Sequence, residues 1–249
     1  MDIIYTIWLR SIKRYIRSKS RIIGSISMPL FFLIFLGFGL NSVVQIPGMG
    51  QDYIQFLIPG VVSMSVLFTS VFSGIQIIWD KQFGFLKETL VAPVSRLEIM
   101  LGQTLGGATT AFIQGVIIML LALIIGLQIT NPVGFLIAFG FMALIGISFT
   151  AFGIAIASRM EDMHGFQLIM NFVVFPIFGL SGALFPISSL PSWIAPITLF
   201  DPLTYGVEGI RYGLTGVSQI NPVVSFIVLG AFAVFMTISG AYLFRKIRF

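Results

Sequence analysis

The stretch Asp80–Glu98, DKQFGFLKETLVAPVSRLE, lies between two long apolar runs and carries a cluster of charges: Asp80, Lys81, Lys87, Glu88, Arg96 and Glu98. The apolar residues of its first half recur about one helical turn apart, which predicts a short amphipathic helix: Phe83, Leu86, Leu90 and Val94. Pro93 ends this pattern because proline has no backbone N–H and disfavours helix in the residue before it. Ser95 and Glu98 then have the spacing of a capping box. We expect an amphipathic helix, a break and the capped start of a long apolar helix; a solvated loop is the alternative for the first part.

The composition is typical of a chain embedded in a membrane. Of the 249 residues, 57% are hydrophobic and 9% are charged, whereas about a quarter of the residues in a soluble domain are charged. Six apolar runs each approach or exceed the roughly 20 residues that cross a bilayer as a helix: about 22–40, 55–79, 99–126, 133–157, 165–183 and 222–244. The sequence therefore predicts an all-α integral membrane protein whose residues 1–249 form a single transmembrane domain.

Residues 2–21, before the first run, have one apolar and one mostly basic helical face. The apolar face contains Ile4, Trp8, Ile12 and Tyr15, and the basic residues are Arg10, Lys13, Arg14 and Arg17. Such a helix is suited to lying along the lipid headgroups. A cleaved signal peptide is the alternative, but no small-residue cleavage pattern follows the next apolar run.

The distribution of basic residues predicts the orientation of the chain. Of the 14 Lys and Arg residues, only Arg211 falls in a segment on the opposite side of the membrane from the termini. Because Lys and Arg gather on the cytoplasmic side, both termini and the segment 80–98 are predicted to be cytoplasmic. The net charge of +5 thus reflects membrane orientation, and nucleic acid is not an expected partner.

The outer segment 184–221 is fairly apolar and is interrupted by four prolines: Pro186, Pro191, Pro196 and Pro202. Pro191 predicts a short helix through Trp193. Asp201 before Pro202 predicts a helix N-terminus.

The helix that starts at Pro202 is expected to run to about Leu214, with Glu208 and Arg211 as an i,i+3 pair. The pieces of the outer segment are too short to span a bilayer. We therefore expect a re-entrant or interfacial helical hairpin between spans 5 and 6, where protein or water satisfies the backbone.

Groups that carry chemistry are sparse. The chain has no cysteine and one histidine, which excludes a cysteine nucleophile and a multi-histidine metal site within one chain. His164 beside Glu161 and Asp162 is better interpreted as a solvated turn residue than as a metal ligand or an acid–base group. The absence of G-x-x-x-x-G-K-[ST] means that ATP, if it is used, is bound by another subunit.

No Asp, Glu, Lys, Arg or His falls inside the predicted spans. This pattern disfavours an ion-coupled secondary transporter and a membrane enzyme acting on lipids, although a Na⁺ site can be built from carbonyls and hydroxyls. Gly102 and Gly106 form a G-x-x-x-G, whose spacing lets helices approach closely; in a chain with 26 glycines the motif is weak.

Two segments resemble those of a known family. The first is Gly84–Arg96, GFLKETLVAPVSR, followed by Leu101-Gly102; the second combines SGALFP at 181–186, Leu190-Pro191-x-Trp193, and DPLTY at 201–205 with Arg211. With six spans and a basic amphipathic helix before them, essentially the whole chain resembles the permease of type-2 ABC exporters. The nearest resemblance is to the daunorubicin-resistance-like drug-export branch.

The resemblance implies a homodimer of permeases with two copies of a separate ATPase subunit, which uses ATP and Mg²⁺; this chain itself holds no catalytic residue, cofactor or metal. It implies that a coupling helix and its flanks dock on the ATPase: Phe83, Leu86, Lys87, Glu88, Leu90, Val91 and Arg96. The N-terminal helix, with Arg10, Lys13, Arg14 and Arg17, is also implied to contact the ATPase. The implied outer hairpin contains Phe185, Pro186, Pro191, Trp193, Asp201, Pro202, Tyr205, Glu208 and Arg211.

The predicted function is therefore that of a multi-pass permease subunit in the cell (inner) membrane, in contact with membrane lipid. Because the spans are apolar and uncharged, the expected cargo is an amphipathic drug-like or lipid-like molecule. An ion-coupled secondary transporter is the main alternative. Polysaccharide and glycolipid exporters share the architecture, so the resemblance does not identify the cargo.

Overall fold

The computed structural model of the chain describes residues 3–41, 53–85, 95–127 and 132–246. Every regular element in these ranges is a helix. Six helices are long and apolar enough to cross a membrane: Lys19–Phe38, Tyr53–Gln82, Arg96–Ile125, Val133–Ala157, Met163–Leu180 and Pro222–Arg245. The prediction of an all-α protein with six transmembrane helices is confirmed.

The helices follow one another without strands in the described ranges. They are α1 (Ile3–Arg17), α2 (Lys19–Phe31), a π-helical continuation (Phe32–Phe38), α3 (Gly39–Asn41), α4 (Tyr53–Ser73), α5 (Ile75–Gln82), α7 (Arg96–Ile125), α8 (Pro132–Ala157), α9 (Met163–Leu180), a 3₁₀ turn (Ile187–Ser189), α10 (Ala195–Thr198), α11 (Pro202–Thr215) and α12 (Pro222–Arg245).

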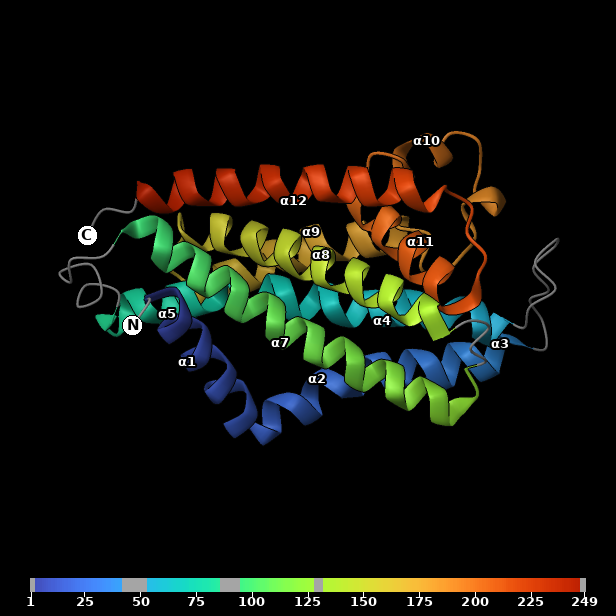
Figure 1. Cartoon of the computed structure of the whole chain (residues 1–249), viewed down its shortest axis with the longest axis horizontal. Coiled ribbons are helices and arrows are strands. Elements are labelled where there is room, and N and C mark those ends of the chain that lie inside the picture. The colour runs from blue at the N-terminus through green and yellow to red at the C-terminus, as the bar shows by residue number, and fades with distance from the viewer. Residues whose placement is uncertain (1–2, 42–52, 86–94, 128–131, 247–249) are drawn as a thin grey trace.

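The long helices lie side by side along the long axis of the molecule (Figure 1). Both termini lie at the end that also carries α5, whereas α3, α10 and α11 lie at the other end (Figure 1). An arrangement with both termini on one side of the membrane agrees with the predicted topology. Which side they face stays a prediction.

The centre of the bundle is α8, which packs against α4, α7, α11 and α12. Glycines let the backbones of α4 and α8 touch. A Cβ on Gly153 would lie 2.4 Å from the Val71 carbonyl oxygen, and one on Gly74 would lie 2.5 Å from the Gly153 carbonyl. No larger side chain fits at either position, so these small residues fix how closely the two spans pack.

Two helix starts follow the local signals in the sequence. Ser95 and Glu98 form the predicted capping box at the start of α7. The Asp201 carboxylate accepts a hydrogen bond from the Leu203 N–H at 2.9 Å, and α11 begins at Pro202 as predicted.

Three boundaries differ from the prediction. The N-terminal helix ends at Arg17 and not at residue 21, and the second span extends through α5, so that Asp80 belongs to a helix. The predicted helix from Pro191 through Trp193 is wrong. Pro191 instead starts a turn, its carbonyl accepting from the Ile194 N–H at 2.9 Å. α10 begins only at Ala195, because Pro196 fits its first turn without losing a hydrogen bond.

Candidate functional site

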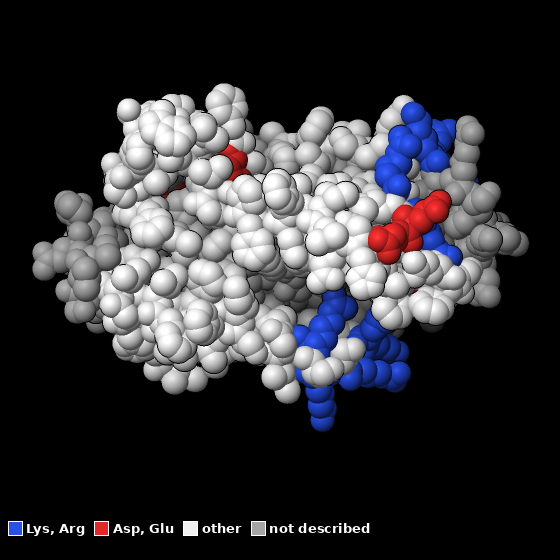
Figure 2. All heavy atoms as spheres, turned by 180° about the vertical axis from the view of Figure 1, so that it is seen from behind, with Lys and Arg blue, Asp and Glu red and all other residues white. Residues whose placement is uncertain are grey.

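Charged side chains gather at one end of the bundle, which we call the charged end. In Figure 2 the Lys and Arg atoms of the visible face lie towards the end that carries the termini, and the middle of that face is uncharged. The described members of the charged end, apart from α1 and the start of α2, are Asp80, Lys81, Arg96, Glu98, Arg159, Glu161, Asp162, Arg245 and Lys246. Helix α1 joins this end through its own basic residues.

Helix α1 packs tightly along α7. A Cβ on Gly102 would lie 2.9 Å from the Ile7 Cβ, and one on Gly106 would lie 2.6 Å from Ser11. The G-x-x-x-G motif therefore receives α1 rather than another span. Trp8 Nε1 also donates to Thr109 Oγ1 at 3.0 Å.

One basic residue of α1 faces the bundle. Arg10 Nη2 donates to Asp80 Oδ2 at 2.6 Å, and the Arg10 guanidinium lies 4.1 Å from the centroid of the Phe85 ring. The Asp80 side chain is only 7% exposed and also accepts from Gln76 Nε2 at 2.7 Å and Gln103 Nε2 at 3.1 Å. A buried carboxylate needs such partners, and here they come from α1, α5 and α7.

The other basic residues predicted on α1 lie outside this contact. Lys13, Arg14 and Arg17 are exposed. The predicted division into an apolar and a basic face is therefore correct except at Arg10, which lies at the border between the two faces.

A second link fastens the end of α5 to α8. Lys81 Nζ donates to the carbonyls of Ala157, Ser158 and Met160 at 3.3, 2.6 and 3.1 Å. A cation at the C-terminus of a helix satisfies carbonyls that have no helical partner and opposes the helix dipole. Gln82 Nε2 donates to the Glu161 carbonyl at 2.8 Å in the same turn.

The start of α7 is fastened to the end of α12. Arg96 Nη1 donates to the Arg245 carbonyl at 2.6 Å. Residues 86–94 therefore connect two helix ends, of which one is held by α1 and α8 and the other by α12.

The predicted ATPase-coupling residues fall partly outside the described residues. Leu86, Lys87, Glu88, Leu90 and Val91 lie in residues 86–94, and nothing about their structure is stated. Phe83 is 71% exposed at the C-cap of α5. Gly84 follows with φ of 77°, a left-handed conformation that commonly ends helices. The predicted helical stripe is thus interrupted directly after Phe83.

The end of the bundle opposite the charged end contains a fully buried ion pair. Glu208 and Arg211 form the predicted i,i+3 pair and are both inaccessible to solvent. Arg211 Nη2 donates to the Gly182 carbonyl at 2.8 Å, and the guanidinium lies 4.0 Å from the Phe56 ring centroid. Glu208 Oε2 accepts from the Gln219 N–H at 2.5 Å. The pair fastens α11 to the turn after α9, to α4 and to the loop before α12.

The remaining predicted hairpin residues divide into exposed and buried groups. Phe185 is 50% exposed and Trp193 is 71% exposed, and Pro191 is exposed in the turn. Pro186 is buried, Pro202 is half-buried, and the Tyr205 hydroxyl donates to the Leu199 carbonyl at 2.8 Å. The re-entrant depth of this hairpin stays a prediction.

Asp201 is a buried carboxylate whose pKa is strongly shifted. Burial raises its pKa to about 7, although the hydrogen bond from Leu203 opposes the shift. Its Oδ2 atom has no partner among the described residues. The neutral form is therefore favoured below about pH 7.

The turn before α9 offers no metal site among the residues that the structure describes, where no group of three His, Cys, Asp or Glu side chains converges. Asp162 accepts from the backbone N–H groups of His164 and Gly165 at 3.2 and 2.6 Å and so caps α9. These hydrogen bonds lower the Asp162 pKa.

Sequence reasoning missed the pairing of Arg10 with Asp80 and the burial of Glu208 with Arg211. A local signal existed for Asp80, because Gln76 precedes it by one helical turn. No local signal indicated the partner from α1, which lies 70 residues away in the sequence.

Comparison with known proteins gives consistent relatives. The sequence profile of the ABC-2 type transporter family matches residues 3–215. The chain is 31% identical over 203 residues to a putative transport permease ycf38 of Cyanophora paradoxa, covering 80% of this chain and 70% of that one. It is 25% identical over 233 residues to the inner membrane transport permease YadH of Escherichia coli K12, covering 92% and 89%. It is 30% identical over 220 residues to nodulation protein J of Rhizobium leguminosarum bv. trifolii, covering 87% and 81%. The chain, with its six candidate transmembrane helices, is therefore a transport permease and belongs to the ABC-2 type transporter family.

Proposed function

We propose that this chain is the membrane-spanning subunit of an ATP-driven exporter and acts as a homodimer with two copies of a separate ATPase. Membership of the family supports this, because an ABC-2 permease implies a partner ABC ATPase subunit. The charged end lies on the cytoplasmic side of the cell (inner) membrane in this proposal, as the distribution of Lys and Arg predicts.

The observation that carries the proposal is the anchoring of both ends of residues 86–94. On one side Arg10–Asp80 and Lys81 connect α5 to α1, α7 and α8. On the other side Arg96 connects α7 to α12. In this proposal the ATPase pushes on residues 86–94, and the contacts at the two flanking helix ends pass the push on to α1, α7, α8 and α12.

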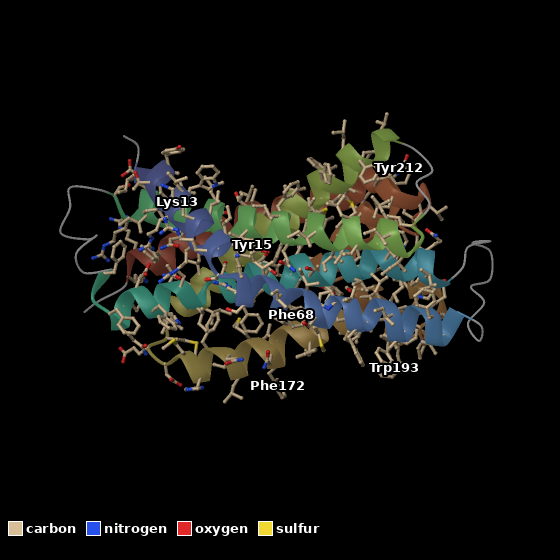
Figure 3. The ribbon with its side chains drawn as sticks, turned by 90° about the horizontal axis from the view of Figure 1, so that it is seen from below. Lys13, Tyr15, Phe68, Phe172, Trp193 and Tyr212 are labelled. Atoms are coloured by element: carbon tan, nitrogen blue, oxygen red, sulfur yellow. The ribbon has the colours of Figure 1, made fainter. Side chains whose placement is uncertain are left out.

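The transport path is proposed to run between two copies of the chain. Phe172 on α9 is 86% exposed and Phe35 after α2 is 62% exposed, and Figure 3 shows Phe172 pointing away from the bundle. Aromatic side chains on these faces suit a second copy or an apolar cargo. An amphipathic drug-like or lipid-like molecule is the cargo class we propose.

Co-purification from native membrane in mild detergent tests the proposal. The variant Phe83→Arg places a charge at an exposed ring of the charged end, and Phe200→Arg is the matched control, since Phe200 is 88% exposed at the other end. We expect a partner with a P-loop that is retained with Phe200→Arg and lost with Phe83→Arg. If no ATP-binding partner is found and the chain alone transports cargo in response to an ion gradient, the secondary-transporter alternative is correct instead.

A further inference from the structure

A cavity of about 220 Å³ lies between α2 and α4, beside the last turn of α1. Its apolar wall consists of Met28, Pro29, Met64, Phe68 and Phe72, and its polar wall of Tyr15, Arg21, Ser25, Ser65 and Thr69. Figure 3 shows Tyr15 and Phe68 near the middle of the length of the bundle, so the cavity extends inwards from the charged end.

A smaller polar chamber adjoins this cavity and shares Tyr15 and Arg21 with it. The chamber measures about 40 Å³, and its basic residues are Arg10, Arg14 and Arg21. Arg10 is neutralised by Asp80. Neither Arg14 nor Arg21 forms a salt bridge within the described part of the chain. The chamber thus carries two arginine charges in excess.

One unsatisfied polar atom belongs to a residue that lines the apolar cavity, and a second lies behind Tyr15, on a residue that lines neither space. Ser65 is 2% exposed, lines the apolar cavity, and its Oγ has no partner in the described ranges. The Tyr15 hydroxyl donates to Gln114 Oε1 at 2.5 Å, while Gln114 Nε2 is buried without a described partner. Leaving buried polar groups unpaired costs free energy, so a ligand or water that reaches them is stabilised.

We propose that this two-part cavity binds an anionic amphiphile, with an oxyanion head group held by Arg14 and Arg21 and one apolar tail packed against Met28, Met64 and Phe68. Guanidinium groups bind carboxylate or phosphate through paired, charge-assisted hydrogen bonds. The flexible Met side chains adapt to tails of different shape. The two excess arginine charges repel a cationic head group, so a cationic amphiphile is not expected to bind in this cavity.

The volume limits how much of the ligand is enclosed. Pockets that enclose a drug-sized ligand measure roughly 300–1,000 Å³, and this cavity is smaller. It accommodates one chain or ring, while the rest of the molecule stays in the bilayer beside α2. Where the ligand is cargo, this proposal rests on the proposed function and adds to it the charge of the cargo and its place of entry.

Binding to the purified full chain in phosphatidylcholine nanodiscs tests the proposal without any ATPase. Dioctanoyl phosphatidic acid, dioctanoyl phosphatidylcholine and inorganic phosphate are titrated separately, and native mass spectrometry counts the bound molecules. We expect one phosphatidic acid per chain, with at least about tenfold weaker binding of the other two probes.

Matched variants locate the site. Arg14→Ala and Arg21→Ala are each expected to weaken phosphatidic acid binding about tenfold, whereas Lys13→Ala and Arg17→Ala, which remove charges outside both spaces, change it less than about twofold. Gly24→Leu fills the cavity, because a Cβ on Gly24 meets open space and Gly24 lines the wall. Gly39→Leu also meets open space but lies outside the cavity.

Several outcomes overturn the proposal. Equal losses with Lys13→Ala and Arg14→Ala mean that only the general surface charge attracts the lipid. Equal affinity for phosphatidylcholine removes the role of the anion, and equal affinity for inorganic phosphate removes the role of the tail. If Gly24→Leu does not fold, as judged by its thermal midpoint, the exposed Arg21→Ala variant decides the result.

A second arm distinguishes the source of the ligand. With the ATPase partner and ATP, a labelled anionic amphiphile that leaves the site during turnover is cargo, and one that remains bound is a resident lipid. Both results satisfy the proposed chemistry. Because binding is measured on the permease alone, its failure leaves the coupling proposal intact, and failure to find an ATPase leaves the binding result intact.

Discussion

Removing Arg10 is predicted to leave a buried, uncompensated carboxylate at the charged end. Asp80 then keeps only the two neutral donors Gln76 and Gln103, at 2.7 and 3.1 Å. Breaking a fully buried ion pair costs about 3–5 kcal/mol. The Arg10 side chain is 30% exposed, so solvent screens part of the interaction, and we expect about 1–3 kcal/mol.

The sign of a double-mutant cycle separates this effect from simple loss of contacts. Asp80→Asn is expected to destabilise the wild type, because it removes the charge that Arg10 pairs with. The same change in an Arg10→Ala background is expected to be neutral or stabilising, because it removes the unpaired charge. Arg17→Ala, on the same helix but exposed, is the control and is expected to have little effect.

The assay is the thermal midpoint of the purified chain in one detergent at one scan rate, since membrane proteins often unfold irreversibly. At about 2–4 °C per kcal/mol for a chain of this size, Arg10→Ala lowers the midpoint by about 2–12 °C. ATP-driven transport in the presence of the partner is the functional readout, and uncoupling is expected in parallel. If Asp80→Asn destabilises both backgrounds equally, the two residues act independently and the proposed link between α1 and α5 is refuted.

Three further predictions concern packing, pH and topology. Gly106→Val is expected to separate α1 from α7 and lower the thermal midpoint by about 2–12 °C, from an overpacking cost of about 1–3 kcal/mol, whereas Gly230→Val, which meets open space, is not. The folded-state pKa of Asp201 is raised from 3.8 to about 7, so the contribution of Asp201 to stability is greatest below pH 3.8 and is lost as the pH rises to about 7. Asp201→Asn, which keeps the N-cap, is therefore expected to stabilise the chain at pH 8 by at most about 4 kcal/mol. Thermal melts check this, and at pH 4 the variant is expected to match the wild type. In this cysteine-free chain, Trp193→Cys is expected to react with an impermeant maleimide on intact cells, and Arg17→Cys only after the membrane is opened; the reverse result would invert the topology.

The sequence predicts features that depend on neighbouring residues along the chain. Ser95 with Glu98 and Asp201 with Pro202 specify helix starts through local hydrogen bonds, and both starts are correct. The apolar runs predict six spans because the bilayer sets the length of an apolar helix. The second span is predicted to end at residue 79, whereas the helix continues to Gln82. The sequence does not reveal this extension, because a helix tolerates the buried Asp80 only when a distant partner compensates its charge.

The features that escaped prediction depend on residues far apart in the sequence. The G-x-x-x-G of Gly102 and Gly106 predicts close approach of a helix but does not identify that helix, which is α1. In the same way, the spacing of Glu208 and Arg211 is compatible with an exposed pair. Only the packing of α11 against α4, α8 and α12 buries it.

The contacts of the described carboxylates indicate which charges remain available to bind partners. In the described part of the chain, Asp80 and Glu208 pair with arginines, while Glu98, Asp162 and Asp201 cap helices. These five acids are therefore committed to holding the fold. The exposed lysines and arginines of α1 have no such internal role in the same ranges, so the charged end presents a surplus of positive charge. An acidic surface on an ATPase and an anionic head group in the cavity both complement that surplus, which makes the two proposals electrostatically consistent with each other.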